Sequence, residues 1–211
     1  MEIKSLYFNG LRECCYIVWD ESQECVIIDP GFCSENEFGR LKGFIGEKNL
    51  TPVKILLTHC HFDHVLGLED ARLYWNLPVF FDRRELEQLD RAPRYSEMLG
   101  LKTKPFLGES TDINDGDIIR FGNTELEVIS TPGHTEGGIC YYCRKEGVIF
   151  TGDTLFAGSI GRTDHLGGNL EQLLGSITRK LMTLDGEVKV FPGHGSKTDI
   201  AYERATNPFL Q

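Results

Sequence analysis

The sequence predicts an α/β protein in which two β-sheets pack against each other and helices lie on the outside. Three observations lead to this class. The chain opens with three strand-like segments, continues with alternating helical and strand patterns, and then repeats the order of strands followed by helices. Apolar residues make up 40% of the chain, which is enough for a sizeable core. No repeat or low-complexity linker divides the sequence, so we expect a single domain over residues 1–211.

The first half of the chain shows both periodicities. Phe38, Leu41 and Ile45 recur at helical spacing and predict a helix over 34–48. The apolar, β-branched run at 53–58 predicts a buried strand. The other elements expected here are strands at 2–8, 13–19, 24–29 and 78–81, and helices at 65–76 and 83–91.

The second half begins with a segment that carries no sustained pattern. This segment spans residues 92–116, and its lack of pattern predicts a functional loop or lid. Gly122 and Asn123 then form a tight hairpin signal between two strands. The elements expected after the loop are strands at 117–121, 124–130, 138–144, 147–151 and 187–191, and helices at 169–182 and 197–205.

Charge and cysteine content limit the partners and the compartment. The formal net charge of −10 argues against a surface that binds nucleic acid or an anionic membrane. No run of about 18 apolar residues is present, and residues 1–8 do not resemble a signal peptide. We therefore expect a cytoplasmic protein whose seven cysteines are reduced. Cys140 and Cys143 would face opposite sides of a strand, so we interpret them as packing residues.

Metal-binding residue types follow four of the predicted strands. A rigid scaffold of strands aims the side chains of the following loops into one crevice. Five of the six histidines obey this rule, which makes a shared metal site the simplest explanation. The residues at these strand ends are His59, His61, Asp63, His64, His134, Asp153 and His194.

The spacing of the first cluster is compatible with a second ion beside the first. His59 and His61 are two apart, and on an extended segment they point the same way. Asp63 and His64 are adjacent, cannot share that direction, and could serve a second ion. Cys60 would face away from these ligands and pack. His165 lies outside the strand-end pattern, and we expect it near the pocket mouth rather than among the ligands.

The segments "HCHFDH", "TPGHT", "TGDTL" and "PGHG", in this order, resemble the metallo-β-lactamase superfamily, and most closely its glyoxalase II type of thioester hydrolase. The resemblance extends from "IIDPG" to "NPFL" and implies a four-layer αββα sandwich with a dinuclear metal centre. It further implies that one metal is held by His59, His61 and His134, the second by Asp63, His64 and His194, with Asp153 bridging them. Asp29 matches a position that orients ligand imidazoles.

The activity that this resemblance implies is hydrolysis of a small-molecule thioester or ester. A hydroxide shared by two divalent metals would attack the carbonyl, and Asp63 could also accept a proton. Zinc suits the ligand set, and iron or manganese could replace it. Arg162 is similar to a basic substrate-contacting residue of glyoxalase II, and Tyr141 could line the pocket.

Departures from the family pattern and rival activities refine this expectation. Many β-lactamases of the superfamily use a cysteine where this chain has Asp153, which argues against β-lactam hydrolysis. The chain ends soon after His194, so we expect no C-terminal helical domain of the kind that contributes to glutathione binding in glyoxalase II. The alternatives are a persulfide dioxygenase with a single iron, a lactonase or other ester hydrolase, a nuclease of the superfamily, and a metal-binding protein without activity. A complete second ligand set favours the dinuclear hydrolase.

Overall fold

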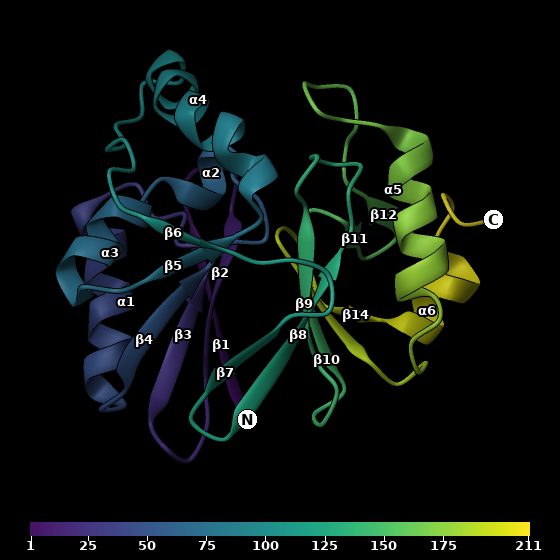
Figure 1. Cartoon of the computed structure of the whole chain (residues 1–211), viewed down its shortest axis with the longest axis horizontal. Helices are drawn as coiled ribbons and strands as arrows, with labels where there is room; N and C mark the ends of the chain where they lie inside the picture. The colour runs from purple at the N-terminus through teal and green to yellow at the C-terminus, as the bar shows by residue number, and fades with distance from the viewer.

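The computed structural model describes residues 1–211 and contains two six-stranded sheets with helices on their outer faces (Figure 1). The first sheet consists, in spatial order, of β1 (Glu2–Phe8), β2 (Glu13–Trp19), β3 (Glu24–Ile28), β4 (Thr51–Leu56), β5 (Val79–Phe81) and β6 (Ser110–Asp112). The second consists of β14 (Thr198–Asp199), β13 (Lys189–Pro192), β10 (Val148–Gly152), β9 (Ile139–Cys143), β8 (Thr124–Ser130) and β7 (Ile118–Phe121). A separate small pair is formed by β11 (Leu155–Phe156) and β12 (Ser159–Ile160).

The helices divide between the two outer faces, as Figure 1 shows. Outside the first sheet lie α1 (Glu35–Glu47), α2 (Phe62–Val65), α3 (Leu68–Trp75) and α4 (Leu86–Met98), the last preceded by the 3₁₀ turn η1 (Arg83–Glu85). Outside the second lie α5 (Leu170–Ser176), its π-helical continuation η2 (Ile177–Leu181) and α6 (Ile200–Thr206). This is the αββα order of layers that the resemblance implied. No helix is both long and apolar enough to cross a membrane.

Strand direction sets which loops meet. Strands β3, β4, β5 and β6 run parallel, so their carboxyl ends lie at one edge of the first sheet. In the second sheet β10 and β13 are also parallel, and Gly152 pairs with Pro192 at their carboxyl ends. The loops that follow these strands are therefore neighbours, and this is where the polar residues of the sequence pattern occur.

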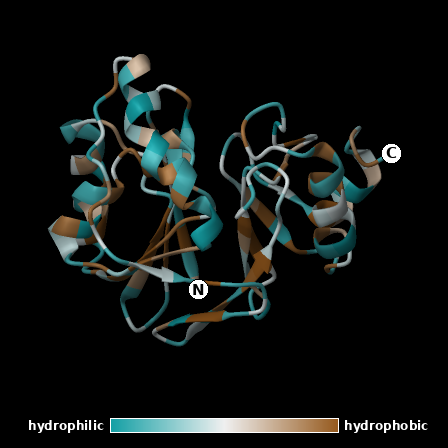
Figure 2. Ribbon diagram, turned by 45° about the horizontal axis from the view of Figure 1, so that its top comes forward, coloured by the Kyte–Doolittle hydropathy of each residue, from teal (hydrophilic) through white to brown (hydrophobic).

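Three buried apolar clusters hold the four layers together. The cluster between the sheets includes Tyr16, Phe150 and Phe191. The other two fill the spaces between each sheet and its helices, with Leu41 in one and Leu173 in the other. In Figure 2 the strands are accordingly mostly brown, while the helices alternate between hydrophobic and hydrophilic colours.

Strand alternation separates the two cysteines of β9. Cys140 belongs to the outer cluster beneath α5, whereas Cys143 belongs to the cluster between the sheets. The prediction that they face opposite sides is confirmed. All seven cysteines of the chain are free.

Several helix boundaries differ from the sequence prediction: α6, for example, begins at Ile200 rather than at 197, because Thr198 and Asp199 form β14. Helix α4 continues to Met98 through Pro93, although proline lacks the N–H needed for one helical hydrogen bond. Burial of Leu89, Ala92 and Ser96 on one face keeps the helix intact, so the first part of the expected loop is helical. The helix predicted at 65–76 is α3, which begins only at Leu68, and a short helix that was not predicted, α2, precedes it. The two are separated at Gly67, where a Cβ would lie 2.5 Å from the Phe32 ring.

Candidate metal centre

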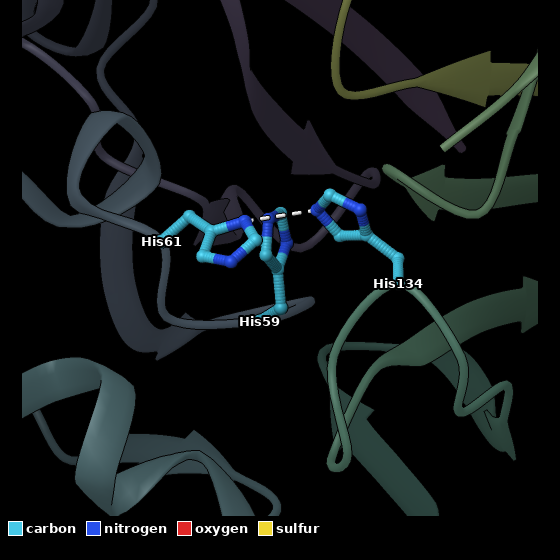
Figure 3. A group of neighbouring side chains, drawn as sticks. All are labelled: His59, His61 and His134. Carbon is cyan, nitrogen blue, oxygen red and sulfur yellow. Dashed lines mark hydrogen bonds between the residues drawn. The ribbon is translucent and has the colours of Figure 1, made fainter. Parts of the chain in front are cut away.

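The four loops after β4, β8, β10 and β13 meet at one edge of the two sheets. The structure brings together all seven strand-end residues of the sequence pattern there. Figure 3 shows His59 and His61, which follow β4, facing His134, which follows β8 of the other sheet. Residues that are far apart in the chain therefore point into one space between the sheets.

The first donor group consists of His59, His61 and His134. Their ligand atoms lie within 4.8 Å of one another. His134 Nε2 is 2.9 Å from His61 Nδ1 (dashed line in Figure 3). His59 Nε2 is buried and has no hydrogen-bond partner. A buried nitrogen without a partner, aimed at two further imidazoles, fits a metal ion that would accept all three lone pairs.

The second donor group consists of Asp63, His64 and His194, whose ligand atoms again lie within 4.8 Å of one another. His194 Nε2 is 3.1 Å from Asp63 Oδ2 and 3.3 Å from His64 Nε2. His64 is completely buried, while His194 is partly open to the pocket. This group thus offers one carboxylate oxygen and two imidazole nitrogens.

Asp153 lies between the two groups. Its Oδ1 is 3.4 Å from His64 Nε2 in the second group, and its Oδ2 is 3.6 Å from His134 Nε2 in the first. Oδ1 is buried without a hydrogen-bond partner. A carboxylate with an oxygen toward each group could be shared by two ions.

Hydrogen bonds on the far side of the imidazoles fix their orientation. Asp29, which has a positive φ of 50°, accepts hydrogen bonds from Thr58 N at 2.8 Å and Thr58 Oγ1 at 2.6 Å. Its Oδ2 is also 3.1 Å from His64 Nδ1. The backbone oxygen of Arg162 lies 2.8 Å from His134 Nδ1 in the same way. Partners of this kind aim the other ring nitrogen at a metal.

The electrostatics of the two groups favour a cation. Burial lowers the pKa of His59 well below its ordinary value, and burial together with the His134 ring lowers the pKa of His61 to about 3. Burial would raise the pKa of Asp153, but the neighbouring His64 lowers it. Burial likewise opposes a charge on His64, yet Asp153 and Asp63 raise its pKa well above the ordinary value. The imidazoles of the first group are therefore neutral, which is the state that metal ions bind, whereas a metal in the second group would displace a proton from His64 beside the ionised carboxylates.

A pocket of about 430 Å³ opens above the donor atoms. Its wall on one side comes from α4, through Gln88 and Tyr95, and on the other from Leu166. Gln88 Nε2 donates a 2.9 Å hydrogen bond to the Leu166 backbone oxygen and so joins the two walls. Leu11 and Phe62 add further apolar surface. Isolated residues of these types carry no pattern, which is why the sequence did not point to them.

The remaining residues singled out from the sequence have different positions. Arg162 lines the pocket, and its exposed guanidinium binds Asp164 through two hydrogen bonds of 2.7 and 2.9 Å. His165 also lines it, with its ring 4.6 Å from that of His61. Tyr141 does not line the pocket: it is completely buried between the sheets, and its hydroxyl donates to the Leu57 backbone oxygen at 2.8 Å. Cys60 is buried in the outer cluster.

Two buried glutamates beside the centre had no sequence signal. Glu13 lies next to Gly31, and both of its carboxylate oxygens are buried without a hydrogen-bond partner. Burial raises the pKa of Glu13 well above its ordinary value. Glu85 is also buried, but both of its oxygens accept hydrogen bonds from backbone N–H groups. Glutamates usually lie on the surface, so only tertiary structure could identify these two.

Comparison with known proteins places the chain in a family. Residues 11–194 match the model of the metallo-beta-lactamase superfamily. The chain is 41% identical over 189 residues to the probable metallo-hydrolase YqgX of Bacillus subtilis, covering 89% of this chain and 87% of that protein. It is 34% identical over 212 residues to the hydroxyacylglutathione hydrolase GloC of Haemophilus influenzae, covering 100% and 98%.

Solved structures give the same result. The B3 metallo-beta-lactamase BLEG-1 superposes with a TM-score of 0.88 at 36% identity and covers 100% of both chains. The di-iron-bound form of TTHA1623 superposes with a TM-score of 0.88 at 32% identity, covering 98% of this chain and 100% of that one. The histidine and aspartate groups are thus metal-binding groups for divalent ions, and the chain belongs to the metallo-beta-lactamase superfamily, among its metal-dependent hydrolases.

Proposed function

We propose that the protein is a dinuclear-metal-dependent hydrolase of small-molecule thioesters, and in particular of hydroxyacyl thioesters. The observation that carries the proposal is the pair of donor groups with Asp153 between them, at the floor of a pocket large enough for a small substrate. Hydrolysis of a hydroxyacyl thioester is also what the name of the GloC relative describes for that protein.

In this proposal His59, His61 and His134 hold one metal, and Asp63, His64 and His194 hold the other. Asp153 contributes to both. Two divalent ions in such a site lower the pKa of water and polarise a carbonyl oxygen. Zinc fits imidazole and carboxylate ligands, and iron is an alternative because the TTHA1623 relative carries two irons.

The side chains around the metals provide a proton acceptor and an apolar wall for the pocket. The Asp63 carboxylate, whose pKa is lowered by His64 and His194 in spite of burial, is ionised, and its oxygen that does not bind metal could accept the proton of an attacking water. Phe62, Tyr95 and Leu166 present apolar surface that keeps bulk water from the acyl group. A thiolate is a good leaving group, so the site needs no separate acid to protonate it.

Metal analysis and a substrate panel test this function together. Purified protein should contain two equivalents of metal and hydrolyse S-lactoylglutathione or other thioesters. Replacing Asp63 by alanine should lower kcat by about 10²–10⁴-fold if it accepts the proton as well as binding metal. The matched control is Arg120→Ala, an exposed residue on β7, which should leave activity unchanged. Full thioesterase activity in Asp63→Ala or His59→Ala would contradict the mechanism.

β-Lactam hydrolysis is a second candidate because BLEG-1, described as a B3 metallo-beta-lactamase, matches the whole chain. A chromogenic cephalosporin added to the same panel distinguishes the two activities. If kcat/KM is higher for the cephalosporin than for every thioester, the thioesterase proposal gives way to β-lactam hydrolysis. The opposite order supports the thioesterase.

A further inference from the structure

Glu85 connects the two loops that carry the first donor group. It is the last residue of η1, directly before α4, and is 1% exposed. Its Oε2 accepts a hydrogen bond from Cys60 N at 2.8 Å, and its Oε1 accepts one from Gly137 N at 2.8 Å. Hydrogen bonds to a buried carboxylate are stronger than those between neutral groups.

The two N–H donors belong to opposite sides of the centre. Cys60 stands between His59 and His61 in the loop that follows β4 of the first sheet. Gly137 is three residues after His134, in the loop between β8 and β9 of the second sheet. A single carboxylate therefore joins the backbone segments that hold all three imidazoles of the first group.

Local packing leaves little freedom at either end of this connection. A side chain at position 137 would lie 2.9 Å from Glu85 Cγ, so the glycine permits the close approach. The Cys60 side chain is completely buried in the outer cluster, which keeps its N–H turned toward Glu85. Helix α4 begins immediately after Glu85 and contributes Gln88 and Tyr95 to the pocket wall.

We propose that Glu85 is a positioning residue that fixes His59 and His61 relative to His134 and couples this donor group to the pocket wall formed by α4. Its carboxylate accepts hydrogen bonds from the loops of the first group and from none of Asp63, His64 and His194. In the second group, the His64 ring is oriented by its contact with Asp29. The inference rests on the proposed dinuclear centre and adds to it a residue that binds neither metal nor substrate.

The test measures zinc binding rather than turnover. Competition with a chromophoric chelator gives the two stepwise Zn²⁺ affinities of wild-type protein and of Glu85→Ala and Glu85→Gln. Loss of a residue that orients ligands weakens metal binding by about 10–100-fold. We expect a decrease of this size in one of the two affinities for Glu85→Ala. The decrease should be smaller for Glu85→Gln, because glutamine keeps one acceptor oxygen of the same reach.

Glu203→Ala is the matched control. Glu203 is also completely buried and accepts hydrogen bonds from Gly158 N and Thr198 Oγ1, but it contacts no loop of the first group. This variant should lose stability while keeping both zinc affinities. Unchanged affinities in Glu85→Ala, or equal decreases in Glu85→Ala and Glu203→Ala, would overturn the positioning role. Wild-type protein that binds fewer than two Zn²⁺ would overturn the dinuclear centre itself and this inference with it.

Discussion

The exposed carboxylate of Asp164 determines how much of the Arg162 charge is available to a substrate in the pocket. Arg162 is the one lysine or arginine that lines the pocket, and both of its hydrogen bonds go to Asp164. The Arg162 partner lowers the pKa of Asp164 to about 2, so the pair is ionised and nearly neutral as a whole at physiological pH. Under the proposed function, an anionic thiol carrier such as glutathione would therefore meet a cation that already has a partner.

Replacing Asp164 by asparagine should favour anionic carriers. The freed guanidinium is expected to raise kcat/KM for S-lactoylglutathione by about two- to five-fold, the size typical of an exposed ion pair. The same acyl group on the uncharged carrier N-acetylcysteamine should show no increase. The gain should also fall at high salt, where exposed charges are screened. Equal gains for both carriers would show that Asp164 acts on the site in some other way than through charge.

Gly193 is required for the shape of the metal centre. A Cβ at this position would overlap Asp153 Oδ1 and lie 2.7 Å from His64 Cε1. The backbone cannot move aside, because Gly193 N donates to Gly152 O and Gly193 O accepts from Cys14 N, both at 2.7 Å. The side chains of Asp153 and His64 would have to move instead.

We therefore expect Gly193→Ala to lose metal while remaining folded. Elemental analysis should find less than two equivalents, since displacement affects a residue shared by both donor groups. Gly39→Ala is the control, because its site in α1 is exposed and has no heavy atom within 4 Å of the new Cβ. That change should raise the free energy of unfolding by about 0.4–1 kcal/mol and leave the metal content alone. Two equivalents of metal in Gly193→Ala would refute the overlap argument.

At the scale of elements, the β7–β8 hairpin is tied to the turn between β2 and β3. Asp20 Oδ2 accepts hydrogen bonds of 2.7 Å from Asn123 N and from Thr124 Oγ1. Burial would raise the pKa of Asp20, but these bonds and those from Ser22 lower it to about 2. The contact therefore links the two sheets, which have no strand in common.

Asp20→Asn should weaken this link in a pH-dependent way. Because the folded-state pKa is depressed, the ionised carboxylate stabilises the fold fully above the unfolded pKa of about 3.9, and this stabilisation is lost as pH falls toward 2. At pH 7 the variant should lose about 1–3 kcal/mol of unfolding free energy in urea titrations. At pH 3 the difference from wild type should be smaller. A difference that is constant between pH 7 and pH 3 would argue against the carboxylate charge as its source.

The sequence predicts the elements whose signals are local. Strand-like runs and a glycine-asparagine turn give β7, β8 and their hairpin. Residues that follow a strand can be assigned to its carboxyl end without knowing the fold. This rule is sufficient to name the seven residues that the structure brings together. Local signals fail for the end of α4, where burial of one helix face outweighs Pro93. They also fail for Tyr141, because its orientation depends on which face of β9 meets the other sheet. Glu85 is beyond sequence reasoning because its partners, Cys60 and Gly137, are brought to it only by the packing of two sheets.

Across the whole molecule, the proposed metal centre joins the two halves of the sandwich. The first sheet side supplies His59, His61, Asp63 and His64, and the second supplies His134, Asp153 and His194. Each donor group contains residues from both sides. Bound metal would therefore resist separation of the sheets, and its binding energy would add to the stability of the fold.

Removal of metal should accordingly lower the melting temperature. A ligand present at about 100 times its Kd stabilises the folded state by about 2.7 kcal/mol per site. For a chain of this size, loss of one site then corresponds to a decrease in Tm of about 5–10 °C. Calorimetry with and without a chelator measures this decrease, and added Zn²⁺ should reverse it. The control is a His61→Ala/His194→Ala double variant, which lacks one imidazole from each group and should respond little to the chelator. If the chelator leaves the wild-type Tm unchanged, or lowers that of the double variant equally, the metals do not hold the two sheets together.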